Sequence, residues 1–184
     1  MRRMKARLGL LAGVLLLAST TALPEIEKVG RVCGSGICPA WWPKLDPLSG
    51  WHHEDEASFA NSANVQVPDG FTFSNAQTVI YARALYKPRN PETTSLAVLV
   101  RDDQGEFLKE NPSVEIAKLP PLKTKDGQAL ETYTFFPKVA GTWEEVSYGE
   151  EGDFYLIFTI SSRSRAGFVA SLPVYERYIA QYKK

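Results

Sequence analysis

A series of alternating and apolar segments in the C-terminal half of the chain limits its fold more than any other feature. Apolar and polar side chains alternate along residues 128–136 and again along 142–148, as they do in half-buried β-strands. The segment 154–160 (FYLIFTI) is the most apolar of the predicted strands. The sequence KDG at 125–127 and the stretch 149–152 are typical of the turns that join such strands. The pattern therefore predicts an antiparallel sheet.

Two helices accompany this predicted sheet. Residues 93–111 place apolar and charged side chains on opposite sides at helical spacing, although Gly105 leaves a strand over 96–102 as the alternative. A second helix is expected over 164–184, where Pro173 marks a kink or a new start. Helices laid over one face of an antiparallel sheet form an α+β sandwich, which is the fold class that the sequence predicts.

The first 22 residues have the three parts of a secretory signal peptide. Four basic and no acidic residues lie within 1–7, and an uncharged apolar run of 11 residues follows at 8–18, ahead of several small residues. This run is shorter than the roughly 20 residues that a membrane-spanning helix needs, although an uncleaved anchor is the alternative. We expect cleavage after Ala22, a periplasmic or secreted location, and no membrane span after cleavage.

The predicted mature chain divides into two parts. Residues 23–63 are expected to be an irregular lead-in rich in proline, glycine and tryptophan, and this composition excludes a helix over 23–50. Residues 64–184 are expected to be the α+β sandwich domain, in which the β-rich segment 78–86 (TVIYARALY) suits a central strand.

Cys33 and Cys38 flank a Gly-Ser-Gly turn inside the lead-in. In an oxidising compartment two cysteines so close together favour a local disulfide. The alternatives are a pair of metal-binding thiolates or a redox centre. Redox motifs commonly have two intervening residues and lie at a helix start, whereas this pair has four and lies in a loop.

The charge balance limits the class of partner. The whole chain carries 21 basic and 21 acidic residues, and without residues 1–22 it carries 17 basic and 21 acidic, a net charge of −4. A mildly acidic surface disfavours nucleic acid and anionic membranes. We therefore expect a protein or a small ligand of the cell envelope as the partner.

The stretch 130–184 resembles the PsbP-like α/β sandwich. The resemblance lies in a hairpin strand that ends in ETYTFF, then GTWEEVSYGEEGDFYLIFTIS, then a closing helix with SLPVYERYIAQY. An extrinsic photosystem II subunit, a Ran-binding nuclear import factor and several bacterial periplasmic proteins share that fold. The resemblance implies a sandwich over the last two-thirds of the chain and a role in binding or scaffolding without shared catalytic residues.

The segment 51–56 (WHHEDE) contains both histidines of the chain and is the one local cluster rich in metal-ligand types. His52, His53 and Glu54 are the candidate metal ligands, because zinc takes three or four nitrogen, sulfur or carboxylate ligands. Adjacent histidines on a strand point to opposite faces, and no HExxH motif is present. A solvated polar turn with one histidine packed by Trp51 is the alternative.

Trp41, Trp42 and Trp51 could form an aromatic platform for a peptide, glycan or lipid, or could hold the lead-in against the sheet. No catalytic residue and no cofactor is expected, since no constellation of residues supports turnover. The sequence thus favours an exported, non-enzymatic accessory or binding protein that acts through one face of the sandwich. The alternatives are a small metal-dependent or histidine-based hydrolase centred on residues 52–56, and an inhibitor or immunity-type protein.

Overall fold

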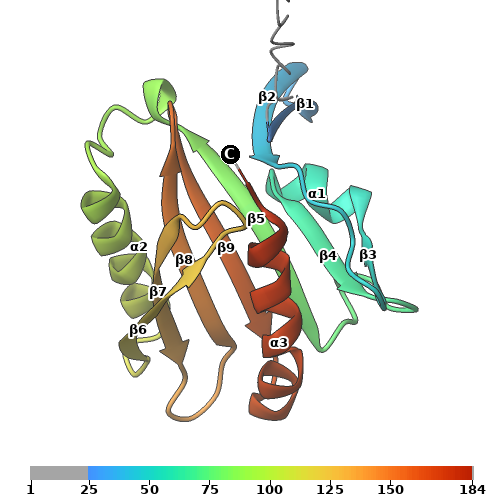
Figure 1. Cartoon of the computed structure of the whole chain (residues 1–184), viewed down its shortest axis with the longest axis vertical. Helices are drawn as coiled ribbons and strands as arrows, with labels where there is room; N and C mark the ends of the chain where they lie inside the picture. The colour runs from blue at the N-terminus through green and yellow to red at the C-terminus, as the bar shows by residue number, and fades with distance from the viewer. Residues whose placement is uncertain (1–24, 184) are drawn as a thin grey trace, which may run out of the picture.

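The computed structural model describes residues 25–183, which form a seven-stranded sheet, a separate two-stranded hairpin and three α-helices (Figure 1). The strands are β1 (Ile26–Cys33), β2 (Gly36–Pro43), β3 (Trp51–His53), β4 (Asn64–Pro68), β5 (Thr78–Tyr86), β6 (Glu115–Lys123), β7 (Ala129–Phe136), β8 (Trp143–Glu151) and β9 (Phe154–Ser162). The helices are α1 (Asp55–Asn61), α2 (Leu96–Glu110) and α3 (Arg165–Gln181), with one 3-10 turn, η1 (Lys87–Arg89). The predicted α+β class is confirmed.

The seven-stranded sheet runs in the order β3-β4-β5-β9-β8-β7-β6, and each neighbouring pair is antiparallel. The most apolar segment of the sequence therefore becomes the middle strand, β9. It pairs along its whole length, from Phe154 to Ser162, with β5 on one side and β8 on the other. A strand in this position has neighbours that cover both its edges and both its faces, which is why six of its nine side chains are apolar.

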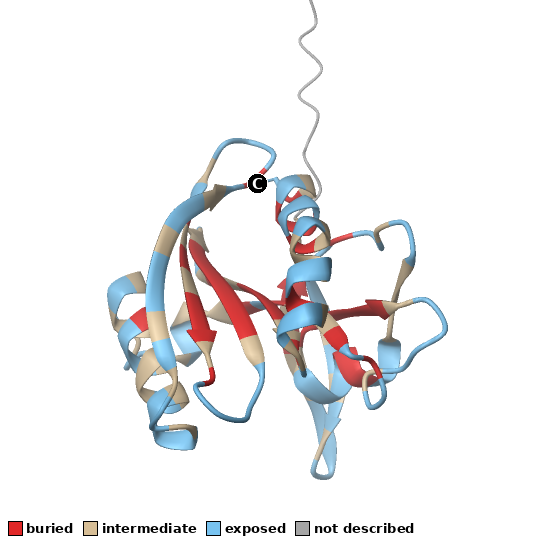
Figure 2. Cartoon of the chain, turned by 90° about the horizontal axis from the view of Figure 1, so that it is seen from below, coloured by how far each residue is buried: buried red, intermediate tan, exposed pale blue. Residues whose placement is uncertain are grey.

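Helix α3 covers one face of the sheet and completes the larger hydrophobic core. Figure 2 shows buried residues concentrated on the central strands and on the side of α3 that faces them. This core contains Ile80, Ala82, Leu130, Leu156, Phe158 and Ile160 from the sheet, and Phe168, Tyr175, Tyr178, Ile179 and Tyr182 from the end of the chain. The buried Tyr175 hydroxyl donates to the carbonyl of Phe158 at 2.9 Å, so its polar atom has a partner inside the core.

Helices α1 and α2 lie on the opposite face, so the expectation that the helices share one face is wrong. The physical reason is that β7 carries aromatic side chains on both faces. Phe135 stacks on Phe107 of α2 at 3.9 Å between ring centroids, whereas its neighbour Phe136 contacts Phe168 of α3 at 5.2 Å. Because successive strand residues point to opposite faces, no single layer of helices could cover both rings.

The prediction of an irregular lead-in is wrong for residues 26–43 and 51–61. Strands β1 and β2 form a regular hairpin from Ile26–Pro43 to Cys33–Gly36, and β3 and α1 follow it. The prolines of β2 are tolerated because each strand of a two-stranded ribbon has one free edge. A proline whose missing N–H would face that edge removes no hydrogen bond between the strands. The predicted disulfide between Cys33 and Cys38 is present and joins the two strands across the hairpin turn.

The two predicted helices are present as α2 and α3, and α1 is a third that the sequence did not indicate. Serine caps both long helices: the Ser95 hydroxyl accepts from the Val98 N–H at 3.2 Å, and the Ser164 hydroxyl accepts from the Gly167 N–H at 3.1 Å. The alternative of a strand over 96–102 is excluded by α2.

The predicted signal peptide lies outside the described residues. Within residues 25–183, no helix is long and apolar enough to cross a membrane.

Candidate functional site

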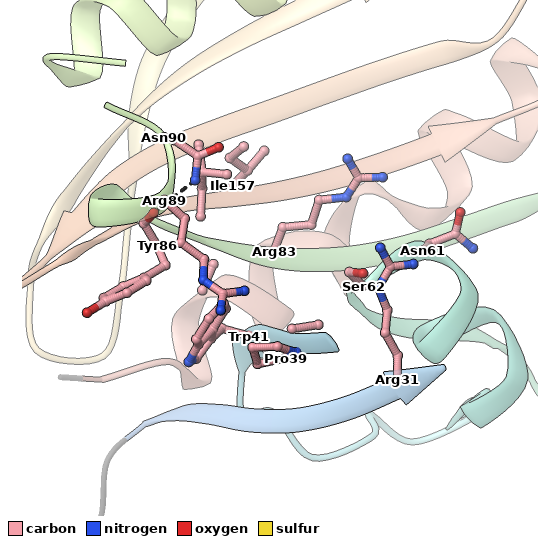
Figure 3. Close-up of a pocket in the computed structure, with 13 residues that line it drawn as sticks. Arg31, Pro39, Trp41, Asn61, Ser62, Arg83, Tyr86, Arg89, Asn90 and Ile157 are labelled. Atoms are coloured by element: carbon pink, nitrogen blue, oxygen red, sulfur yellow. Dashed lines mark hydrogen bonds between the residues drawn. The ribbon is translucent and has the colours of Figure 1, made fainter. Parts of the chain in front are cut away.

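A hollow of about 420 Å³ lies between the β1–β2 hairpin and strand β5 (Figure 3). We call it the arginine hollow, because Arg31, Arg83 and Arg89 line it. The remaining lining residues come from β2, the end of α1, β5, the stretch after η1 and β9: Pro39, Ala40, Trp41, Asn61, Ser62, Ala84, Leu85, Tyr86, Asn90 and Ile157.

Each arginine belongs to a different element, and in Figure 3 the Arg83 side chain extends from β5 away from the hairpin, whereas Arg31 and Arg89 lie on the hairpin side. Arg31 projects from β1, Arg83 from the middle of β5, and Arg89 from η1, the turn that follows β5. Arg83 and Arg89 are exposed and Arg31 is half-buried. Across residues 25–183, no carboxylate lies within ion-pair distance of any of these three guanidinium groups. The hollow therefore holds a local excess of positive charge in a domain whose overall charge is slightly negative.

Aromatic rings form the base on which Arg89 rests. The Arg89 guanidinium lies 5.2 Å from the centroid of the Trp41 ring. Trp41 in turn contacts Tyr86 at 5.0 Å and Phe154 at 6.1 Å between ring centroids. A cation over an aromatic face is attracted by the ring quadrupole, so Arg89 is held in place while its N–H groups stay available.

Two acidic side chains on the face of the sheet that carries Arg83 have hydrogen-bond partners of their own. Asp103 of α2 accepts a hydrogen bond from the Tyr148 hydroxyl. Glu144 of β8 accepts one from Ser161 at 2.6 Å and one from Thr142 at 2.9 Å. Burial raises the pKa of both carboxyl groups, and the positive charge of Arg83 opposes this rise at Asp103. Asp103 and Glu144 therefore bind hydroxyl groups of the fold and form no ion pair with the three arginines.

Chemically, a cavity lined by three arginines is suited to an anion. Arginine presents planar N–H donors that match carboxylate and phosphate oxygens, often two at a time. Ser62 and Tyr86 are the hydroxyl side chains in this lining, and no histidine or carboxylate among the described residues lines the hollow with them. The arrangement can bind and orient a charged group.

The structure does not bring the candidate metal ligands together. His52 Nδ1 lies 3.4 Å from Asp69 Oδ1, at an exposed position. His53 Nε2 instead lies 2.6 Å from the hydroxyl of Ser58, and the Glu54 carboxylate accepts from the backbone N–H of Ala57 as the cap of α1. Among the residues that the structure describes, no group of three or more histidine, cysteine, aspartate or glutamate side chains could hold a metal ion.

The three candidate tryptophans lie in different surroundings. Trp41 lines the arginine hollow, whereas its neighbour Trp42 is buried and contacts His53 and Phe59 edge-on. Trp51 packs against the core beneath α3. Adjacent residues on β2 point to opposite sides, which separates Trp41 from Trp42. Of the three, Trp41 is the one that lines the hollow.

The arginines were not among the residues singled out from the sequence. Arg83 carried a signal that could have been used, because it is the one charged residue in the predicted strand 78–86. A charge in the middle of a β-rich apolar segment marks a face that is not closed by packing. Arg31 and Arg89 lie in turn-rich stretches, where an arginine is ordinary and gives no signal.

Comparison of the chain with known protein families and with curated proteins finds no match.

Proposed function

We propose that this protein is an exported, non-catalytic binding protein of the cell envelope that holds an anionic ligand in the arginine hollow. The observation that carries the proposal is that Arg31, Arg83 and Arg89, without carboxylate partners, line one cavity of about 420 Å³. The resemblance of residues 130–184 to PsbP-like sandwiches agrees with a binding role, because members of that fold mostly bind or scaffold.

The exposure of Arg83 and Arg89 determines what kind of binding to expect. Charges that remain in contact with solvent are screened by salt within about 8–10 Å at physiological ionic strength. We therefore expect the affinity for a simple anion to be modest and to fall as the salt concentration rises. Binding through buried apolar contacts alone would lack this dependence.

The test is calorimetric titration of the mature protein with inorganic phosphate and with acetate. Arg83→Gln removes the charge and keeps a shorter polar side chain, and we expect it to weaken binding by about 10-fold or more. Arg177→Gln, at an exposed position of α3 on the opposite side of the sheet, is the matched control and should leave binding unchanged. Equal affinity of Arg83→Gln and the wild type for both anions would overturn the proposal.

The proposed export has separate support. The basic head and apolar run of residues 1–22 are typical of a signal peptide, and disulfides such as Cys33–Cys38 persist in oxidising compartments. Intact-mass analysis of the protein isolated from its host should give a chain that begins at Leu23. A chain that still begins at Met1 and lies in the cytosolic fraction would contradict export.

A further inference from the structure

A second, smaller hollow of about 160 Å³ adjoins the arginine hollow. We call it the apolar hollow, because Val65, Phe73 and Val79 line it together with Tyr81 and Ser161; the Arg83 guanidinium lies 5.5 Å from the centroid of the Tyr81 ring. It shares Asn61 and Arg83 with the arginine hollow, so these two side chains stand at the boundary between them. A ligand that contacts Arg83 can therefore reach both spaces.

The sheet register explains why apolar side chains meet here. Val65 of β4 is paired directly with Tyr81 of β5, so the two side chains share a face. Val79 and Arg83 lie two residues before and after Tyr81, which places all three on that same face. Helix α1 packs on β4 and α2 packs on β8 and β7, so this part of β5 lies between the two helices.

The Trp41 ring is not free to take the apolar part of a ligand. Arg89 lies over it at 5.2 Å, and the Nζ atom of Lys28 lies 5.8 Å from its centroid. Tyr86 and Phe154 contact it as well. The indole ring of Trp41 is thus covered by cations and other rings. The nonpolar part of a ligand would instead contact the adjacent apolar hollow.

We propose that the ligand is a small monocarboxylate whose charged end binds Arg83 and whose aromatic ring or branched aliphatic end fills the apolar hollow. This inference rests on the proposed function, because the charged end uses the arginine hollow. The size of the nonpolar end follows from the volume: a cavity of about 150 Å³ lined by apolar side chains holds one benzene ring. Long acyl chains exceed this space.

The test compares acetate with phenylacetate in calorimetric titrations of the mature protein. The two compounds share a carboxylate and differ by one ring, and we expect phenylacetate to bind about tenfold more tightly, equivalent to about 1.4 kcal/mol. Val79→Phe fills the apolar hollow from within and should abolish the preference for phenylacetate over acetate. Val169→Phe, at an exposed position of α3, is the matched control and should keep the preference.

Phe73→Ala provides a second variant that does not add bulk to a strand. It removes one wall of the apolar hollow and should also reduce the preference for phenylacetate. Equal binding of acetate and phenylacetate to the wild type would overturn this inference and leave the proposed function standing. Failure of acetate and phenylacetate to bind, with phosphate still bound, would overturn this inference alone, and failure of all three anions to bind would overturn both. Tighter binding of dodecanoate than of phenylacetate would overturn the ring-sized limit on the nonpolar end.

Discussion

The guanidinium group of Arg89 lies over the indole ring of Trp41, 5.2 Å from the ring centroid. The two residues are far apart in sequence and meet because the hairpin places β2 against the end of β5. An arginine that is already held by a ring loses less side-chain freedom when a ligand binds. Under the proposed function, Trp41 is therefore expected to position Arg89 without contacting the ligand itself.

Replacement of Trp41 by leucine should therefore weaken the binding of inorganic phosphate. An exposed cation–π contact is worth about 0.5–1 kcal/mol, which predicts a two- to fivefold loss of affinity in calorimetric titration. Trp41→Phe keeps an aromatic face beneath Arg89 and should lose less. Thermal unfolding of both variants separates this effect from the loss of packing against Tyr86 and Phe154. An unchanged affinity of Trp41→Leu would contradict the positioning role.

The disulfide should stabilise the hairpin and contribute little to the sheet. Cys33 and Cys38 are separated by five positions, and the entropy that a disulfide removes from the unfolded chain is smallest for short loops. We expect the double variant Cys33→Ser with Cys38→Ser to lose no more than about 2 kcal/mol of the free energy of unfolding. Amide hydrogen exchange should become faster in residues 26–43 and stay unchanged in β5, β8 and β9. Faster exchange throughout the sheet would show that the disulfide supports the whole domain.

Local patterns in the sequence were sufficient for the sheet, the two long helices and the disulfide. The strands over 128–136 and 154–160 follow from alternation and apolar content, and Cys33 and Cys38 are close enough in sequence to pair. The prediction that α2 and α3 lie on the same face of the sheet was wrong, because the alternation of side chains along a strand does not say which helix covers which face. Phe135 and Phe136 held that information, since adjacent aromatic residues on a strand require a cover on each face.

The candidate site was beyond the reach of local patterns. Arg31, Arg83 and Arg89 come together through the packing of the hairpin on β5, which depends on contacts between distant segments. Trp41 was found, but as part of a platform with Trp42, and two neighbours on a strand point to opposite sides. His52 and His53 were candidates because both are potential metal ligands, but in the structure His52 lies beside Asp69 and His53 beside Ser58.

Glu145 makes the stability of the domain depend on pH. It is 3% exposed on the face of β8 that α3 covers, and burial, together with the negative charge of Glu176, raises the pKa of its carboxyl group to about 7. The folded state therefore binds this proton more tightly than the unfolded state, where the ordinary value is 4.5. The free energy of unfolding should fall as the pH rises from about 4.5 to about 7 and stay lower above that range.

Glu145→Gln mimics the protonated carboxyl group and should remove this fall. A shift of this size corresponds to at most about 3 kcal/mol, so the variant should be more stable than the wild type near pH 8 by up to that amount and nearly equal to it near pH 5. Urea unfolding at the two pH values measures the difference. Glu176→Gln should give a smaller gain, because it relieves the charge repulsion and leaves the burial unchanged. Lower stability of Glu145→Gln at the higher pH would contradict the assignment.

Two helical glycines should respond to alanine in opposite directions. Gly105 lies within α2, and a Cβ atom added there would meet no heavy atom within 4 Å. Gly167 lies in the first turn of α3, and a Cβ atom there would come within 2.7 Å of Ser162 Oγ and 2.9 Å of Gln77 Cγ. The Ser162 hydroxyl cannot move away freely, because it is buried and accepts a hydrogen bond from Thr78 at 2.9 Å.

Gly105→Ala should raise the free energy of unfolding by about 0.5–1 kcal/mol, the usual difference between the two residues inside a helix. Gly167→Ala gains the same helix propensity but must separate α3 from the ends of β5 and β9, and overpacking of this kind costs about 1–3 kcal/mol. Urea unfolding of the two variants in parallel is the measurement, with each serving as the control for the other. If Gly167→Ala were as stable as Gly105→Ala, the close contact between α3 and the sheet at Ser162 would be wrong.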